Sequence, residues 1–125
     1  MNKRCVEIER TDTELRYRME LAEGDAYFDG HFPDQPVLPG VGQLHLLTQA
    51  LAESLGRPVH WTSVHSIRFR KPILPASPCE VTVQRPTAEG EVRFQIHGEA
   101  GLMADGRFSI ARSSSDTDQE EANHV

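Results

Sequence analysis

His31 and Gly40 are the residues whose types and spacing most suggest chemistry. His31 stands in a loop with prolines at every third position, Pro33, Pro36 and Pro39. A proline fixes φ and removes a backbone donor, so this loop is stiff and extended. It holds a side chain whose proton exchanges near neutral pH. Gly40 opens a predicted helix, where unpaired N–H groups and the positive dipole end favour an anion. This pairing of a base with an anion site predicts a functional site.

The elements that must position these residues follow from hydrophobic periodicity. Leu15, Tyr17, Met19 and Leu21 alternate with charged residues, which indicates a strand with one buried face. A shorter strand with Val6 and Ile8 precedes it, and Thr11-Asp12 supplies the turn. Residues 40–55 read as a helix, apolar around most of its circumference, that ends at Gly56 and Pro58. Such a helix is normally buried in a core.

Four more strand patterns follow, around residues 67–69, 81–83, 92–96 and 108–110. Hairpin turns are predicted at Glu89-Gly90 and Asp105-Gly106, because Asp-Gly is a strong two-residue turn signal. Strands joined by tight turns favour an antiparallel sheet. The pattern therefore predicts an α+β fold, with an antiparallel sheet wrapped around one long central helix.

Composition narrows the function classes. The chain has 125 residues, which suits one domain, and its net charge of −6 argues against nucleic-acid binding driven by phosphate contacts. Two cysteines, with no apolar leader and no stretch near the ~18 apolar residues of a membrane span, predict a cytoplasmic protein. We expect one domain over residues 1–112 and a disordered acidic tail over 113–125.

The loop and helix start resemble a known family. Gly-His-Phe-Pro-x-x-Pro-x-x-Pro-Gly-Val, residues 30–41, is similar to the signature of the 3-hydroxyacyl-[acyl carrier protein] dehydratases of the FabZ/FabA type. Residues 67–75 and Asp105-Gly106-Arg107 extend the likeness, which covers roughly residues 4–112. The resemblance implies a hotdog fold and a lyase that converts 3-hydroxyacyl thioesters into trans-2-enoyl thioesters in fatty-acid or related synthesis. It implies no cofactor and no metal.

The resemblance also assigns roles to single residues. His31 would be the general base, and the Gly40 N–H would stabilise the charge that builds on the thioester oxygen. The family places a carboxylate on the helix fourteen residues after the histidine, where this sequence has His45. Three interpretations of His45 stay open. It replaces the acid, it marks a chain that has lost dehydration and binds thioesters or acts on them differently, or it is a core histidine.

Further expectations concern substrate and partners. Candidate walls for the acyl chain are Phe28, Phe32, Leu38 and Val41. Arg68, Arg70 and Lys71 are a candidate docking patch for an acidic acyl carrier protein. The resemblance implies a homodimer or larger homo-oligomer in which the partner supplies the helix residue, with a heterodimer as the alternative. A hotdog acyl thioesterase and a catalytically impaired binding subunit are the competing functions.

Overall fold

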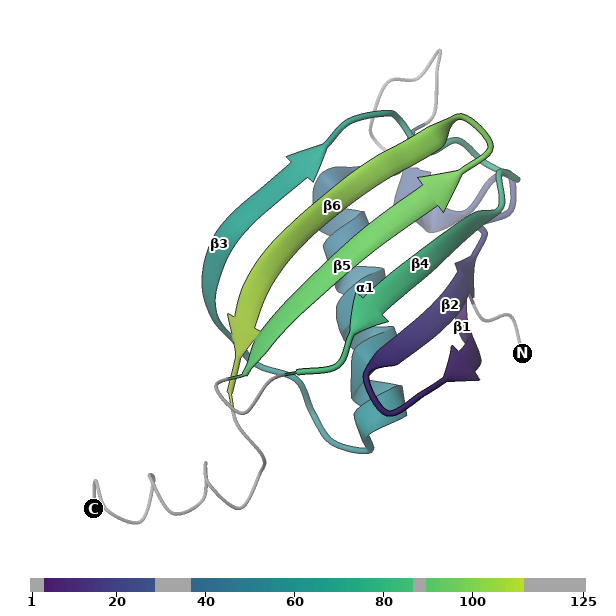
Figure 1. Ribbon diagram of the computed structural model, residues 1–125. Coiled ribbons are helices and arrows are strands. Elements are labelled where there is room, and N and C mark those ends of the chain that lie inside the picture. Colours follow the sequence, from purple (N-terminus) through teal and green to yellow (C-terminus); the bar gives the residue numbers. More distant parts are fainter. Residues whose placement is uncertain (1–3, 29–36, 87–89, 112–125) are drawn as a thin grey trace, which may run out of the picture.

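The computed structural model describes residues 4–28, 37–86 and 90–111. They form six strands, one α-helix and a short 3₁₀-helix (Figure 1). In chain order these are β1 (Cys5–Arg10), β2 (Glu14–Met19), η1 (Ala26–Phe28), α1 (Gly40–Leu55), β3 (Trp61–Phe69), β4 (Cys79–Gln84), β5 (Glu91–Gly98) and β6 (Gly101–Ile110).

The strands make one antiparallel sheet in the order β1-β2-β4-β5-β6-β3. Thr11 forms the β1–β2 turn, where its hydroxyl accepts hydrogen bonds from the N–H groups of Thr13 and Glu14. The antiparallel register places Leu15 opposite Val83 and Val81 opposite Ile96, so apolar side chains align on one face. The predicted antiparallel sheet and its single helix are therefore present.

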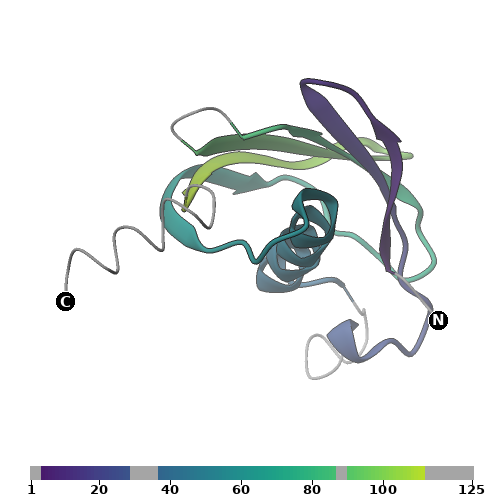
Figure 2. The same ribbon diagram turned by 90° about the horizontal axis from the view of Figure 1, so that it is seen from below.

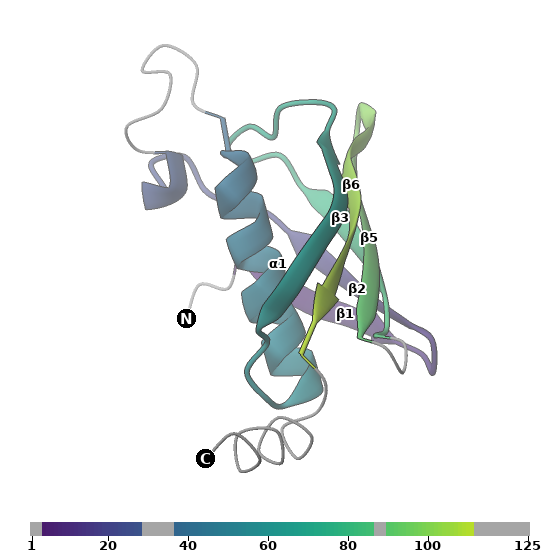
Figure 3. The same ribbon diagram turned by 90° about the vertical axis from the view of Figure 1, so that its left-hand side faces the viewer.

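The sheet curves around α1, which lies along its concave face (Figures 2 and 3). Leu46, Leu47, Ala50 and Leu51 of the helix are buried against inward side chains of β2, β4, β5 and β6. Gly56 ends the helix in the left-handed region, at φ 71° and ψ 25°, and donates its N–H to the Ala52 carbonyl. The predicted helix, residues 40–55, is confirmed together with its glycine end.

The predicted hairpin turn at Asp105-Gly106 is wrong. Both residues lie in the middle of β6, and the β5–β6 connection instead follows Gly98, which pairs with Gly101. Gly106 is there for packing: a Cβ at this position would lie 2.8 Å from Cε1 of Phe94 and 2.8 Å from the Ser66 carbonyl oxygen. The glycine thus serves close approach between strands rather than a turn. Of the other predicted turn, Glu89 lies outside the described residues.

The expectation that the helix is buried around most of its circumference needs correction. The helix is buried on only one side, because Val41, His45, Gln49 and Glu53 form an exposed stripe at four-residue spacing. Strand β3 is mostly exposed because it is an edge strand, and its Phe69 is 48% exposed. A pattern of apolar residues indicates which side chains are buried in the assembled protein. It does not show whether they are buried within one chain or against a partner chain.

Candidate active site at the start of the helix

The start of α1 offers backbone N–H groups with no partner inside the helix. Pro39 precedes it with φ −61° and ψ 151°, and no side chain caps the first turn. The lead-in is anchored by the Leu38 N–H, which donates to the Ile73 carbonyl at 2.8 Å. The missing side chain at Gly40 leaves room for the Phe69 ring, because a Cβ there would lie 2.6 Å from Cε2 of Phe69. The helix start can therefore stabilise negative charge on a ligand.

His45 lies one turn further along, on the exposed stripe of α1. Its Nδ1 is 2.6 Å from the hydroxyl oxygen of Tyr27, and the two rings lie with centroids 6.0 Å apart. Tyr27 belongs to η1, which lies beside the first half of α1 on the side away from the sheet (Figure 3). Of the three interpretations of His45, the structure does not place it in the core, because the side chain is exposed and reaches a polar partner.

Tyr27 is held from two sides. Its ring packs on the helix backbone at Gly42, where a Cβ would come within 3.1 Å of its Cδ1. On another side the Arg4 guanidinium carbon lies 4.9 Å from the ring centroid. Arg4 is fixed in turn by its Nε, which donates to Asp25 at 2.8 Å. Asp25 also accepts the Tyr27 backbone N–H at 3.0 Å.

The charge on Asp25 is stabilised by these contacts. Burial acts to raise the pKa of this carboxyl group, but the hydrogen bonds from Arg4 and from the Tyr27 N–H outweigh burial. Its pKa consequently lies below the usual value, and the carboxylate stays charged near neutral pH. The Asp25–Arg4–Tyr27–His45 series is thus a connected polar chain that ends at the helix.

The predicted acyl-chain walls divide into different environments. Phe28 and Leu38 are buried in the core, whereas Val41 is 79% exposed beside the helix start. Gln43 is buried next to Leu38 and donates its Nε2 to the Leu38 carbonyl at 3.2 Å. Its Oε1 has no hydrogen-bond partner within the part of the chain that the structure describes. His31 and Phe32 lie outside the described residues, so their roles remain predictions.

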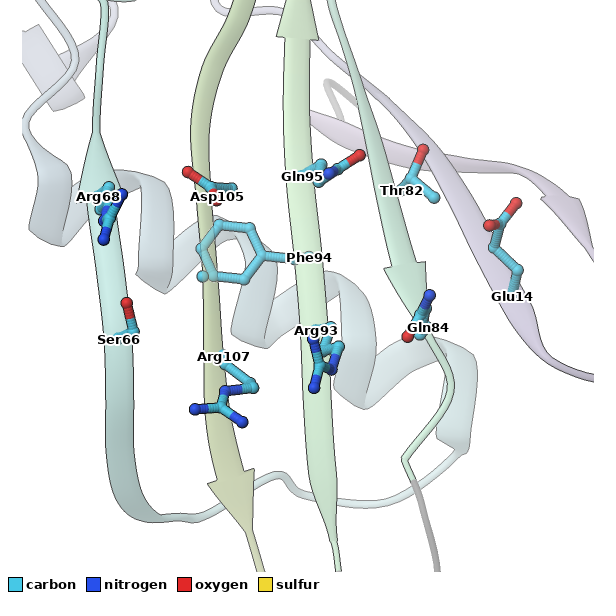
Figure 4. A pocket seen from close by; sticks show the side chains of 11 residues that line it. Glu14, Ser66, Arg68, Thr82, Gln84, Arg93, Phe94, Gln95, Asp105 and Arg107 are labelled. Carbon is cyan, nitrogen blue, oxygen red and sulfur yellow. The ribbon is translucent and has the colours of Figure 1, made fainter.

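The predicted docking residues lie at the end of β3 and directly after it. Arg68 lines a polar cavity on the face turned away from α1, together with Asp105 and Arg107 (Figure 4). Arg70 pairs with Asp105 at 2.8 Å, and the Lys71 ammonium group donates to the Ala100 carbonyl. Within the described residues Arg68 has no ion-pair partner. The predicted docking residues are therefore exposed, but two of them already have partners within the chain.

Tyr27 and Phe69 are the candidate site residues that sequence reasoning missed. Tyr27 lies three positions before the motif of residues 30–41 and eighteen residues before His45, so spacing alone does not connect them. Phe69 was interpreted only as an apolar position of a strand. The sequence shows only that Tyr27 carries a hydroxyl group and lies near the histidine loop. Without the fold, nothing distinguishes it from other tyrosines.

An antiparallel sheet wrapped around a helix, with the candidate site at the start of that helix, defines the hotdog class. The dehydratase heterocomplex ApeI:P from Xenorhabdus doucetiae has a similar fold, with a TM-score of 0.72 at 23% identity over 86% of this chain and 98% of that chain. The PaaI protein of the E. coli phenylacetic acid degradation operon is similar at a TM-score of 0.66, with 17% identity over 86% of this chain and 82% of that one. The predicted hotdog fold is confirmed.

Sequence comparison then defines the family. Residues 7–107 match the ApeI-like family, described as ApeI dehydratase, so the chain belongs to the ApeI-like dehydratases. A 3-hydroxyacyl-[acyl-carrier-protein] dehydratase FabZ of Roseiflexus is 30% identical over 73% of this chain and 71% of its own length. The FabZ of Magnetococcus marinus is 32% identical over 85% and 72%. The resemblance to FabZ is thus confirmed, and these relatives support a dehydratase role.

Two features are absent from the residues that the structure describes. No helix in this part of the chain is long and apolar enough to cross a membrane. Over the same residues, 4–28, 37–86 and 90–111, no group of three or more potential metal ligands comes together.

Proposed function

We propose that this protein dehydrates 3-hydroxyacyl thioesters to trans-2-enoyl thioesters, with His45 as the group that protonates the leaving hydroxyl. The observation that carries the proposal is the placement of His45 on the exposed stripe of α1, five residues after the open helix start at Gly40. Five residues correspond to about 7.5 Å along a helix axis. An acyl group could therefore present its thioester oxygen to the helix start and its 3-hydroxyl group to the imidazole.

The reaction requires three groups. A base removes a proton from the carbon next to the thioester carbonyl, and by resemblance this base is His31. The electron pair moves onto the thioester oxygen, where the Gly40 N–H stabilises the negative charge. As the double bond forms, the 3-hydroxyl group leaves as water and takes a proton from His45. The exposed imidazole and the aligned helix N–H groups support the last two roles.

The proposal extends to assembly and substrate carrier. Val41 and His45 are open to solvent in a single chain, and a second copy covering this helix face would make a dry site for the acyl chain. A homodimer would do this, and a heterodimer is the alternative. We place an acidic acyl carrier protein at Arg68, an exposed basic residue for which the described residues supply no ion-pair partner.

A dehydration assay tests the proposal. It follows enoyl absorbance with a 3-hydroxyacyl thioester on acyl carrier protein, over about pH 5 to 9, for the unaltered protein and for His31→Ala, His45→Ala and His45→Glu. We expect each alanine variant to lose about 10²–10⁴ in kcat, as removal of a general acid or base does. His45→Glu should keep activity with a changed pH profile.

Other outcomes would contradict the proposal. Activity that is absent in the unaltered protein and appears in His45→Glu would assign it instead to an acyl-thioester-binding subunit. Release of free thiol in place of enoyl product would indicate a thioesterase.

A further inference from the structure

We propose that Tyr27 is a positioning residue for His45, one that fixes the orientation of the imidazole and the nitrogen that carries its proton. This inference rests on the proposed function, because it assigns Tyr27 a part in the step that His45 performs. The observation that carries it is the 2.6 Å separation between the Tyr27 hydroxyl oxygen and Nδ1 of His45.

The direction of this hydrogen bond determines what His45 can do. A phenol is a good donor, and a neutral imidazole has one nitrogen that accepts and one that donates. When Tyr27 donates to Nδ1, the proton of the neutral ring must be on Nε2. Nε2–H is then the donor that faces a substrate. The leaving hydroxyl would take this proton, while Nδ1 accepts the phenolic proton of Tyr27, so the ring stays neutral and the phenol becomes a phenolate.

The surroundings of Tyr27 suit both the positioning and this proton transfer. Gly42 lets the ring approach the helix backbone, with a would-be Cβ only 3.1 Å from Cδ1, and so brings the hydroxyl group to the residue one turn later. The Arg4 guanidinium lies over the ring, 4.9 Å from its centroid, and adds a positive charge that favours negative charge on the phenol. Asp25 fixes both partners through Arg4 Nε and the Tyr27 N–H.

Position matters because His45 is exposed on a helix surface. An unrestrained histidine there would exchange between rotamers, and only a fraction of them would face the substrate. Small misplacements of a catalytic group cost large factors in rate. The hydrogen bond should therefore act on kcat, with little effect on KM, because it orients the reacting group and does not touch the acyl chain.

The experiment compares Tyr27→Phe, which removes only the hydroxyl group, with Tyr17→Phe as the matched control. Tyr17 is also bonded to α1, through Ser54 at 2.7 Å, but near the other end of the helix. We expect Tyr27→Phe to lower kcat about tenfold or more with KM nearly unchanged. Tyr17→Phe should keep kcat within about twofold, although it lowers the thermal unfolding midpoint because a hydrogen bond is lost.

Two further measurements separate positioning from a structural role. In the His45→Ala background Tyr27→Phe should cost no further activity, because its effect passes through His45. In ¹⁵N NMR of the neutral ring, the unaltered protein should show Nδ1 as an acceptor and Nε2 protonated, and Tyr27→Phe should lose the shift of a hydrogen-bonded Nδ1.

Each other outcome overturns a defined part of the argument. Full kcat in Tyr27→Phe, while His45→Ala is impaired, would overturn the positioning role alone. An additional loss in the His45→Ala background, or a proton on Nδ1 in the unaltered protein, would also overturn it. A protein with no dehydration activity in any form would instead overturn the proposed function, and the NMR signature would still report whether the hydrogen bond exists.

Discussion

Gly40 is the first residue of α1, at the candidate site, and it lies next to Phe69 at the end of β3. Its missing side chain leaves room for the Phe69 ring, whose Cε2 and Cζ would lie 2.6 and 2.7 Å from a Cβ. Phe69 is half-exposed, so its ring can rotate toward solvent when a methyl group is added. Because such a ring can move away from the clash, the loss of stability should lie at the lower end of the range for overpacked sites.

We therefore expect Gly40→Ala to lower the free energy of unfolding by about 1 kcal/mol in the unaltered chain. In the Phe69→Ala background the same change should cost almost nothing, because the clashing ring is gone. Urea denaturation of the four proteins measures this coupling. An equal cost in both backgrounds would show that the helix backbone, and not the ring, resists a side chain at this position.

Glu7 shows how one carboxylate joins strand β1 to helix α1. It accepts hydrogen bonds from Arg10 at 2.8 Å and from the Ser54 hydroxyl at 2.6 Å. The hydrogen bond from Arg10, followed by that from Ser54, lowers the pKa of this carboxyl group from 4.5 to about 2. Because the folded pKa is depressed, this stabilisation is present above pH 4.5 and is lost as the pH falls toward 2.

The lowered pKa of Glu7 predicts how the stability of Glu7→Gln depends on pH. The variant should be less stable than the unaltered protein at pH 7, and the difference should shrink as the pH falls from 4.5 toward 2. Urea midpoints measured across this range check it. A difference that stays constant with pH would mean that the lost contacts, and not the charge, carry the effect.

At the scale of elements, strand β6 depends on a glycine in its middle. A Cβ at Gly106 would lie 2.8 Å from the Ser66 carbonyl oxygen, which is backbone of the neighbouring strand and cannot move without shifting β3. The other contact, also at 2.8 Å, is with the ring of the buried Phe94. Both neighbours are rigid, which is the opposite of the situation at Gly40.

We expect Gly106→Ala to lower the free energy of unfolding by about 2–3 kcal/mol, within the range for overpacked cores. Gly98→Ala, at the end of β5, is the control, because the nearest atoms there are side-chain atoms of the flexible Met103 at 3.3 Å. Its cost should stay below about 1 kcal/mol. Thermal or urea denaturation compares the two, and equal costs would contradict the argument from rigid neighbours.

For the whole molecule, the important feature is that the strand order leaves β1 and β3 at the edges of the sheet that the described residues form. Strand β3 is the longer of the two edge strands, carries Val64 at 57% exposure, and ends at Phe69 beside the helix start. Strand β1 is the other, with Ile8 at 52% exposure. An exposed apolar edge can pair with another chain. Since β3 leads to the candidate site, we expect a partner chain there.

The prediction is that the protein is a dimer or larger and that Val64→Lys dissociates it, because a lysine on a strand edge opposes pairing. Ile8→Lys, the same kind of change on β1, should leave the assembly intact. Light scattering after size-exclusion chromatography gives the mass of each. Loss of the assembly in Ile8→Lys alone would place the interface on β1. If the partner chain contributes to the site, Val64→Lys should also lose dehydration activity.

Local sequence signals are enough to locate most of the elements and the start of the helix. Three local signals are the alternation over residues 15–19, the apolar run over 40–55 and Gly56. The corresponding strand, helix and helix end lie at these positions. The start of the helix at Gly40 can be predicted in the same way, because a helix N-terminus follows from local turn and capping preferences. The limits of the strands do not follow from local signals alone, since Asp105-Gly106 is a typical turn sequence but lies inside β6.

Which residues act together depends on how the elements pack. Tyr27 and His45 meet because η1 folds back onto the outer face of α1, and Gly106 is required by a strand that passes next to it. Neither contact leaves a periodic signal, since the partners are far apart in the chain and each alone is an ordinary residue. Local preferences are properties of short segments, whereas contacts depend on how the segments pack, so the sequence specified the parts and the packing specified the candidate site.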